Sequence, residues 1–397
     1  MSATPHPPNP DPSPSAHPPR ERFRIAALHS ADGGIVSRLA PTPSGYLHPG
    51  NAFSFVLTWL LVRAHQGRLL LRIDDLDTGR ARPEYLVDLF QTLEWLGLDW
   101  ELGPQTPDEF TARFSQQHRL ELYAHGLRLL ARTGRVFACD CSRKQVASLS
   151  VDGQYAGRCL LRGISLHSPE VAWRLSTPRP MSRSDQADAQ PTPLELAHTS
   201  RGELIADLVR PPRRVCLHTH MRDFVIRRRD GIPAYQLASV VDDLYFGVNL
   251  VVRGEDLYPS TAAQLYLARC LDDAMQLPAA SEESVLFGPD AAEAVASLRP
   301  HDFQRVQLVH HPLLRDESSR KLSKSAGAAS IRSIRSGGAG PELLLGWVGR
   351  NLGVSVEKRL SLAELRDAFE SLNHQCFWSE QASLFPLSDS DEHGPEV

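Results

Sequence analysis

The hydrophobic pattern of residues 34–73 predicts a strand, a helix and a second strand. Short apolar runs occupy residues 34–40 and 68–73, and the stretch between them, 52–66, is apolar over the length of a helix and ends at Gly67. A loop rich in proline and glycine, residues 41–50, separates the first run from the helix. We therefore predict a βαβ unit that opens a parallel sheet.

The same alternation returns in the second half of the chain. Helical patterns cover 83–96 and 108–132, whereas residues 176–200 hold four prolines and little apolar periodicity, which is typical of a surface insertion. From Asp223 onwards the pattern predicts a strand, a helix, a strand and a helix, at 223–228, 234–246, 249–254 and 259–271. We interpret the two regions as halves of one nucleotide-binding sheet that flank an inserted module. Two short helices are predicted later, at 342–351 and 362–372.

Composition is that of a globular chain without a membrane span. Of the 397 residues, 42% are hydrophobic, and the apolar stretch 53–62 is interrupted by Ser54 and Thr58. It is half the length of about 20 residues that a membrane helix needs. The six cysteines are few, and three of them lie within residues 139–159, which fits a metal site in a reducing compartment better than a disulfide framework. We expect a cytoplasmic protein and exclude a secreted disulfide scaffold.

Net charge does not indicate a nucleic-acid-binding protein. The formal charge is −4, and four acidic residues of the tail account for all of it: Asp389, Asp391, Glu392 and Glu396. Local basic groups, Arg227–Arg229 and the set Arg210, Arg213 and Arg214, could still form a face that binds phosphates, although such runs are more often solvated surface.

A first chemical motif follows the first predicted strand. The loop 41–51 ends in His48, Pro49, Gly50 and Asn51 and leads into the helix. Ligands bind to α/β sheets at this kind of crevice, where a helix N-terminus faces phosphate and a glycine lets the backbone approach. His48 can donate a hydrogen bond to phosphate oxygens. Alone, this tetrapeptide is more typical of a structural turn.

A second motif changes that interpretation. Residues 321–325 read Lys-Leu-Ser-Lys-Ser, and Lys321 and Lys324 can bring positive charge to a triphosphate as pyrophosphate leaves. Together, His48-x-Gly50-Asn51 and this lysine motif resemble the two signatures of class I aminoacyl-tRNA synthetases. The resemblance implies a Rossmann-type catalytic domain, catalytic roles for His48, Asn51, Lys321 and Lys324, and ATP, with Mg²⁺, bound by His48, Gly50 and Lys324.

Further stretches resemble the glutamyl branch of that class, over about residues 34–330. They are 38–51, 71–77 and 252–256. The resemblance implies a pocket for L-glutamate formed by Arg38, Leu39, Ala40, Pro41, Thr42, Asp74, Tyr235 and Arg253. Guanidinium groups suit the two carboxylates of glutamate, and a carboxylate suits its α-ammonium. The family usually has glutamate at the position of Asp74, so the shorter side chain is a departure.

Three cysteines and a tyrosine suggest a zinc site. Cys139-x-Cys141 is followed by Tyr155-x-x-x-Cys159, and structural zinc takes four ligands, most often Cys and His. The spacing resembles the site of the glutamyl-Q tRNA(Asp) synthetases, in which a tyrosine is the fourth ligand of one structural Zn²⁺. His167 is the alternative fourth ligand, and buried free cysteines are the alternative to a metal site.

We therefore predict an α/β protein with five segments. They are a disordered proline-rich leader (1–33), the first half of the nucleotide-binding domain (34–134), a zinc module and insertion with a flexible part at 176–200 (135–222), the second half with the lysine motif (223–325), and a flexible stretch with short helices and an acidic tail (326–397).

The predicted activity follows from the resemblance. The segment 326–397 is too short for the anticodon-binding domain of a glutamyl-tRNA synthetase, which favours the glutamyl-Q tRNA(Asp) synthetases. These activate glutamate with ATP and transfer it to queuosine at the wobble position of tRNA(Asp). Three alternatives remain: a truncated glutamyl-tRNA synthetase that charges the 3′ end, an HxGH-type nucleotidyltransferase, which would need neither zinc nor a glutamate pocket, and a non-catalytic RNA-binding relative, which should have lost His48 or Lys324. We expect a monomer without a membrane partner.

Overall fold

The computed structural model describes residues 22–24, 28, 34–150, 155–179, 203–205, 207, 213–277, 298–314, 330–354, 359–372 and 375–377. Its first unit is the predicted βαβ unit. Strand β2 (Val36–Leu39) and strand β3 (Arg68–Leu71) are parallel, with Val36 opposite Arg68 and Leu39 opposite Leu71, and helix α1 (Pro49–Ala64) connects them. The helix begins before the predicted apolar stretch because Pro49 suits the first helical turn.

The second half of the parallel sheet lies beside the first. Strand β9 (Leu250–Gly254) is parallel to β10 (Gln307–His311). The backbone N–H of Asn249 donates to the Val36 carbonyl at 2.9 Å, and Ser37 Oγ donates to the Leu250 carbonyl at 2.8 Å. The strands are therefore arranged β3-β2-β9-β10, with contributions from both halves, as the alternating pattern predicted.

The strand predicted at 223–228 lies in a separate antiparallel sheet and not in the parallel sheet. Strand β8 (Phe224–Arg227) is antiparallel to β5 (Ala172–Leu175), which is antiparallel to β4 (Val136–Cys139). The prediction that the parallel sheet resumes at 223–228 is therefore wrong; it resumes at β9. The burial pattern gives the reason, since side chains of β8 alternate between buried and half-buried, whereas the first four of β9 are all buried.

The helical stretch predicted at 108–132 is interrupted. It comprises α3 (Pro107–Glu109), the π-helical η1 (Phe110–Phe114), the 3₁₀-helical η2 (Gln116–Arg119) and α4 (Leu120–Arg132). The break at Ser115 has an extended ψ of 141°. There the Ser115 hydroxyl donates to Asp75 Oδ2 at 2.5 Å and the Gln116 N–H donates to Asp75 Oδ1 at 2.8 Å. The irregular backbone thus anchors the segment that follows β3.

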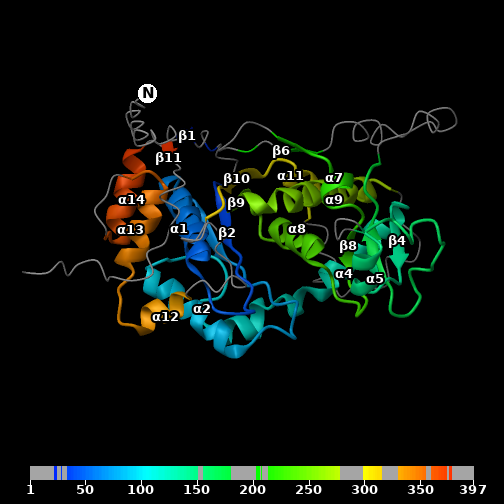
Figure 1. Ribbon diagram of the computed structural model, residues 1–397, viewed down its shortest axis with the longest axis horizontal. Coiled ribbons are helices and arrows are strands. Elements are labelled where there is room, and N and C mark those ends of the chain that lie inside the picture. The colour runs from blue at the N-terminus through cyan, green and yellow to red at the C-terminus, as the bar shows by residue number, and fades with distance from the viewer. Residues whose placement is uncertain are drawn as a thin grey trace, which may run out of the picture.

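Helices lie on both sides of the parallel sheet (Figure 1). Their buried side chains form two hydrophobic clusters. One contains α1 with α13 (Glu342–Asn351) and α14 (Leu362–Ser371), where the rings of Phe53 and Trp347 meet edge to face at 5.9 Å. The other contains α4, α8 (Tyr235–Tyr245) and α9 (Tyr258–Met275). The other helices of the described residues are α2 (Pro83–Leu96), α5 (Arg143–Ser148), α7 (Leu217–His220), η3 (Glu255–Leu257), α11 (Pro300–Phe303) and α12 (Ile331–Ser336).

Two short antiparallel pairs complete the described part. Strand β6 (Glu203–Ile205) pairs with β7 (Arg213–Val215). Strand β1 (Arg22–Arg24), inside the predicted leader 1–33, pairs with β11 (Gln375–Phe377). The rest of the leader except Leu28, most of the insertion at 176–200, the lysine motif and the acidic tail lie outside the described residues. No helix of the described ranges is long and apolar enough to cross a membrane.

Candidate active site

Most residues of the predicted glutamate pocket lie at the carboxyl ends of the central parallel strands. Arg38 is on β2, Asp74 follows β3, and Arg253 is on β9. The backbone continues the strand pairing, because the Asp74 N–H donates to the Pro41 carbonyl at 2.9 Å. Parallel sheets bind ligands at such an edge, where neighbouring strands lead to helices on different sides. The structure therefore brings side chains from both halves of the chain to one edge.

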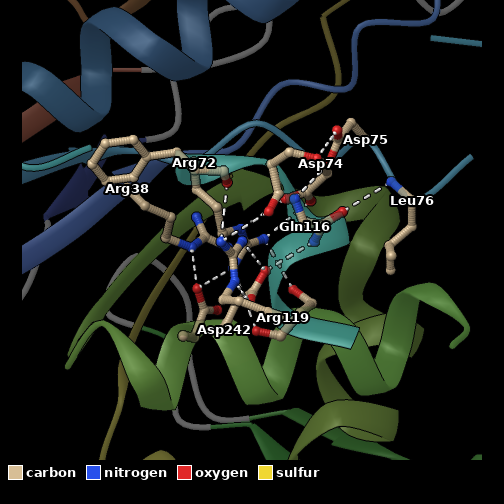
Figure 2. A network of polar contacts seen from close by, with 12 residues as sticks. Arg38, Arg72, Asp74, Asp75, Leu76, Gln116, Arg119 and Asp242 are labelled. Atoms are coloured by element: carbon tan, nitrogen blue, oxygen red, sulfur yellow. Dashed lines mark hydrogen bonds and ion pairs between the residues drawn. The ribbon is translucent and has the colours of Figure 1, made fainter. Parts of the chain in front are cut away.

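Two predicted pocket residues, Arg38 and Asp74, are linked by hydrogen bonds through Arg72 and Asp243. The sequence had not indicated these two linking residues. Arg72 binds Asp74 through two hydrogen bonds, Nε to Oδ1 at 2.8 Å and Nη2 to Oδ2 at 3.1 Å (Figure 2). Its Nη1 donates to Asp243 Oδ1 at 2.5 Å, and Arg38 Nε donates to the same oxygen at 3.1 Å. Two guanidinium groups thus share one carboxylate oxygen.

A second network lies directly beside the first. Asp242 accepts hydrogen bonds from Arg119 at 2.8 and 3.2 Å, from the Tyr123 hydroxyl at 2.7 Å and from Gln116 Nε2 at 2.9 Å (Figure 2). Asp242 and Asp243 are consecutive on α8, yet they bind different arginines. Asp242 pairs with Arg119, whereas Asp243 pairs with Arg38 and Arg72. Their signal in the sequence was a pair of acidic residues within an otherwise apolar helical pattern, because buried carboxylates need charged partners.

Arg253 is buried with incomplete hydrogen bonding. Its side chain is 5% exposed, and Nη1 donates to Gln264 Oε1 at 2.9 Å. Nε and Nη2 have no hydrogen-bond partner in the part of the chain that the structure describes. Burial, with a smaller effect from the charge of Arg38, lowers the pKa of Arg253 to about 10, although Tyr235 and Asp243 oppose the shift. Buried donors of this kind require an acceptor.

The charges around Arg253 are unbalanced. Three guanidinium groups, those of Arg38, Arg72 and Arg253, face two carboxylates, those of Asp74 and Asp243. The charge of Asp242 also reaches Arg72, but this carboxylate is already paired with Arg119. Burial raises the pKa of Asp74, although its pairing with Arg72 opposes the shift. A ligand with an additional negative group would complete this site, since a buried charge is stable only when it is paired.

The other predicted pocket residues surround these groups. Leu39 and Pro41 are buried, Ala40 is half-buried, and Thr42 is exposed. Tyr235 is the first residue of α8 and is 47% exposed. It is close enough to Arg253 to raise the pKa of that guanidinium.

His48, Gly50 and Asn51 lie at the N-terminus of α1. Asn51 Oδ1 accepts a hydrogen bond from the His48 N–H at 3.1 Å, so this asparagine caps the helix. Helix N-termini carry partial positive charge and attract phosphates. Lys321 and Lys324 lie outside the described residues.

The described residues on either side of the lysine motif contact the His48 loop and its helix. Before the motif, His311 Nε2 is 2.6 Å from Ser54 Oγ of α1. After it, the Ile331 N–H donates to the Leu47 carbonyl at 2.8 Å, and Arg332 hydrogen-bonds Tyr46. Described residues on both sides of the lysine motif in the sequence therefore lie next to the first signature.

The predicted metal ligands lie together in the inserted module. The Sγ atoms of Cys139, Cys141 and Cys159 lie within 4.8 Å of one another, with 3.5 Å between Cys141 and Cys159. Sulfurs around tetrahedral zinc are about 3.8 Å apart. The Tyr155 hydroxyl accepts the Cys159 N–H at 2.6 Å, which places the phenol oxygen beside the third cysteine.

The chemistry of this cluster also suits a cation. Burial and the neighbouring Cys159 and Cys139 raise the pKa of Cys141 to about 12, because crowded thiols resist becoming anions together. A metal ion would remove that penalty. His167 is exposed and is not part of the ligand group found among the described residues.

The basic run Arg227–Arg229, which could have formed a phosphate-binding face, contacts other side chains of the protein. Arg228 pairs with Asp230 at 2.7 Å, and Arg229 pairs with Glu170 at 3.3 Å. The guanidinium of Arg227 lies 5.1 Å from the ring of Trp173. These contacts do not support the run as a ready phosphate site.

Comparisons with known proteins agree with the arrangement. Residues 34–286 match the family "tRNA synthetases class I (E and Q), catalytic domain". The chain is 34% identical over 314 residues to the glutamyl-Q tRNA(Asp) synthetase of Symbiobacterium thermophilum, which is 79% of this chain and 84% of that protein. It is 30% identical to the glutamate–tRNA ligase of the same organism, over 78% of this chain and 56% of that protein. The glutamate–tRNA synthetase structure from Elizabethkingia anophelis matches with a TM-score of 0.61 at 21% identity, over 88% of this chain and 69% of that one.

Proposed function

Because this chain belongs to the class I tRNA synthetases of the glutamyl and glutaminyl group, a family of ligases, we propose that it activates L-glutamate with ATP and transfers it to queuosine at the wobble position of tRNA(Asp). The observation that carries the amino-acid assignment is the buried guanidinium of Arg253, which has two donors without partners among the described residues. A side-chain carboxylate supplies the missing acceptor and the missing negative charge, whereas the amide of glutamine supplies only an acceptor.

In this proposal the pocket binds both charged ends of glutamate. Arg38 and Arg253 pair with its carboxylates, Asp74 accepts hydrogen bonds from the α-ammonium, and Tyr235 donates a hydrogen bond at the rim. The backbone of residues 39–42 lines the same edge. Arg72 holds both oxygens of Asp74 from one side. The remaining lone pairs of that carboxylate can accept hydrogen bonds from the α-ammonium. Arg72 thus fixes the orientation of the aspartate side chain, which is shorter than the glutamate usual in the family.

The first chemical step forms glutamyl-adenylate. A carboxylate oxygen of glutamate attacks the α-phosphorus of ATP, and the bond to the β-phosphate oxygen breaks as pyrophosphate leaves. His48, Gly50 and Asn51 at the N-terminus of α1 bind the phosphates, and Lys321 and Lys324 stabilise the charge that develops on them. Mg²⁺ bound to ATP would neutralise part of this charge.

The second step transfers the glutamyl group to RNA. A hydroxyl of the cyclopentene diol of queuosine attacks the adenylate carbonyl, AMP leaves with the electron pair of the anhydride bond, and the hydroxyl proton is released. The similarity to the glutamyl-Q tRNA(Asp) synthetase, 34% identity over 84% of its length, supports this acceptor. The 30% identity to a glutamate–tRNA ligase keeps the 3′-terminal ribose as the alternative.

We also assign one structural Zn²⁺ to the inserted module. Cys139, Cys141 and Cys159 would hold it, with Tyr155 as the fourth ligand, and its binding would stabilise a small cluster with few apolar neighbours.

Glutamate-dependent exchange of pyrophosphate into ATP tests the activation step. In the presence of unfractionated tRNA, we expect exchange with glutamate, and at most a few per cent of that rate with glutamine or aspartate at equal concentration. Equal exchange with glutamine would contradict the charge-based assignment of the pocket.

A further inference from the structure

Asp243 contacts both sides of the proposed glutamate pocket. Its side chain is 1% exposed, and Oδ1 accepts hydrogen bonds from Arg38 at 3.1 Å and from Arg72 at 2.5 Å. The opposite edge of Arg72 binds both oxygens of Asp74. A continuous chain of ion pairs therefore runs from Arg38 through Asp243 and Arg72 to Asp74.

We propose that Asp243 is a positioning residue that fixes both ends of the amino-acid pocket, Arg38 directly and Asp74 through Arg72. The proposal rests on the function proposed above, in which Arg38 meets a carboxylate of glutamate and Asp74 meets its ammonium. Asp243 itself does not touch the substrate.

The geometry at Arg38 shows how such positioning works. Asp243 Oδ1 accepts a hydrogen bond from Nε of Arg38, at one edge of the guanidinium. The guanidinium plane is thereby held from one edge, and in the proposed complex its other edge pairs with a planar carboxylate. A guanidinium with fixed orientation loses less conformational entropy when it binds.

Charge gives Asp243 a second effect on the same pocket. Without its carboxylate, Arg38 would lose its ion pair and Arg72 would keep only its ion pair with Asp74. Like charges repel strongly in a buried environment. The positive charge of Arg38 lowers the pKa of Arg253 and the negative charge of Asp243 raises it, so these groups interact. Loss of Asp243 would push the guanidiniums apart and misplace the groups that hold glutamate.

Asp242 offers a matched control one residue away. Its side chain is 0% exposed and binds Arg119, so it resembles Asp243 in burial and in having an arginine partner. Its other hydrogen-bond partners, Tyr123 and Gln116, belong to the 116–132 region. Asp242 acts on Arg72 and Asp74 through its charge alone, without a hydrogen bond to either. Replacement of either aspartate by asparagine should destabilise the fold, but only Asp243→Asn should alter glutamate binding.

The experiment compares purified wild type, Asp243→Asn and Asp242→Asn by pyrophosphate exchange and by thermal unfolding. For Asp243→Asn we expect the KM for glutamate to rise by about tenfold or more, the loss associated with one or more charge-assisted hydrogen bonds, and the KM for ATP to stay within about twofold. Asp242→Asn should lower the unfolding temperature with the KM for glutamate within about threefold of wild type. A wild-type KM for glutamate in Asp243→Asn, or an equal rise in both variants, would overturn the positioning role.

Asp243→Glu decides the question if Asp243→Asn does not fold. It keeps the charge but moves the carboxylate by one methylene, so we expect a rise of about threefold or more in the KM for glutamate and none for ATP. An unchanged KM for glutamate would overturn the proposal. Absence of glutamate-dependent exchange in the wild type would instead contradict the proposed function, and the positioning role with it.

Discussion

Arg253 and Gln264 are joined by a 2.9 Å hydrogen bond from Nη1 to Oε1, while the Nε and Nη2 of the same buried guanidinium have no hydrogen-bond partner among the described residues. A buried charge with unpaired donors destabilises a fold, so its presence at this edge of the sheet indicates a role with a ligand.

Replacement of Arg253 should therefore separate stability from activity. For Arg253→Gln we expect the KM for glutamate to rise by about 10- to 100-fold, because a charge-assisted contact is lost, while the unfolding temperature stays equal or increases. Arg119→Gln is the control, since it breaks a complete buried pair with Asp242 and should lower the unfolding temperature. Arg253→Gln with a loss of stability as large as that of Arg119→Gln would contradict this account.

The charge of Arg253 also predicts a pH dependence. Its pKa is lowered to about 10, so the charge is present at neutral pH and is lost as the pH rises through about 10. The kcat/KM for glutamate should fall over that range. Because the unfolded chain keeps this proton to higher pH than the folded chain, stability contributed by this group should increase with pH above about 10.

Arg253→Lys tests the assignment of that alkaline decrease. The ordinary pKa of lysine is about two units below that of arginine, and burial lowers both, so the decrease in kcat/KM should begin about two pH units lower. A decrease at unchanged pH would assign it to a different group.

The cysteine cluster predicts one zinc ion per chain. Cys139→Ser and Cys141→Ser should abolish stoichiometric zinc in metal analysis and lower the unfolding temperature, because metal-binding free energy contributes to folding. Cys270→Ser is the control: Cys270 is buried like the cluster but lies outside it, so the zinc content should stay at one. Metal-free wild type of unchanged stability would contradict the site.

Lys324 should act on the rate of activation more than on ATP binding. Its charge is needed most as pyrophosphate leaves, so Lys324→Ala should lower kcat for exchange by about 100- to 1000-fold with a smaller change in the KM for ATP. Lys144→Ala, on the exposed face of α5, should retain wild-type kcat. A change confined to the KM for ATP would show that Lys324 only binds the nucleotide.

The sequence predicted the parts of this structure that depend on local pattern. The βαβ unit, α2, α8, β9, α9, α13 and α14 lie close to their predicted positions, because apolar periodicity and Gly or Pro boundaries determine such elements. The break at Ser115 and the antiparallel pairing of β8 were missed, because both depend on partners distant in the sequence: Asp75 for the first and β5 for the second.

The same distinction applies to the site. The resemblance to the glutamyl branch implied a pocket that contains Arg38, Asp74 and Arg253, and the structure brings these three residues to one edge of the sheet. Arg72 and Asp243 were not selected from the sequence. They are 171 positions apart, and only the folded structure shows that they form an ion pair at 2.5 Å. A motif indicates the residues that meet a ligand, whereas the residues that orient them follow from three-dimensional contacts.

The central claim is that glutamate is attached to queuosine of tRNA(Asp). The most direct measurement incubates the protein with ATP, labelled glutamate and tRNA(Asp) isolated from queuosine-containing and from queuosine-deficient cells, and then locates the label after nuclease digestion. We predict label on the wobble nucleoside of queuosine-containing tRNA(Asp) and none on the queuosine-deficient tRNA. Label on the 3′-terminal adenosine, or equal labelling of both tRNAs, would contradict the account and identify a glutamyl-tRNA synthetase activity instead.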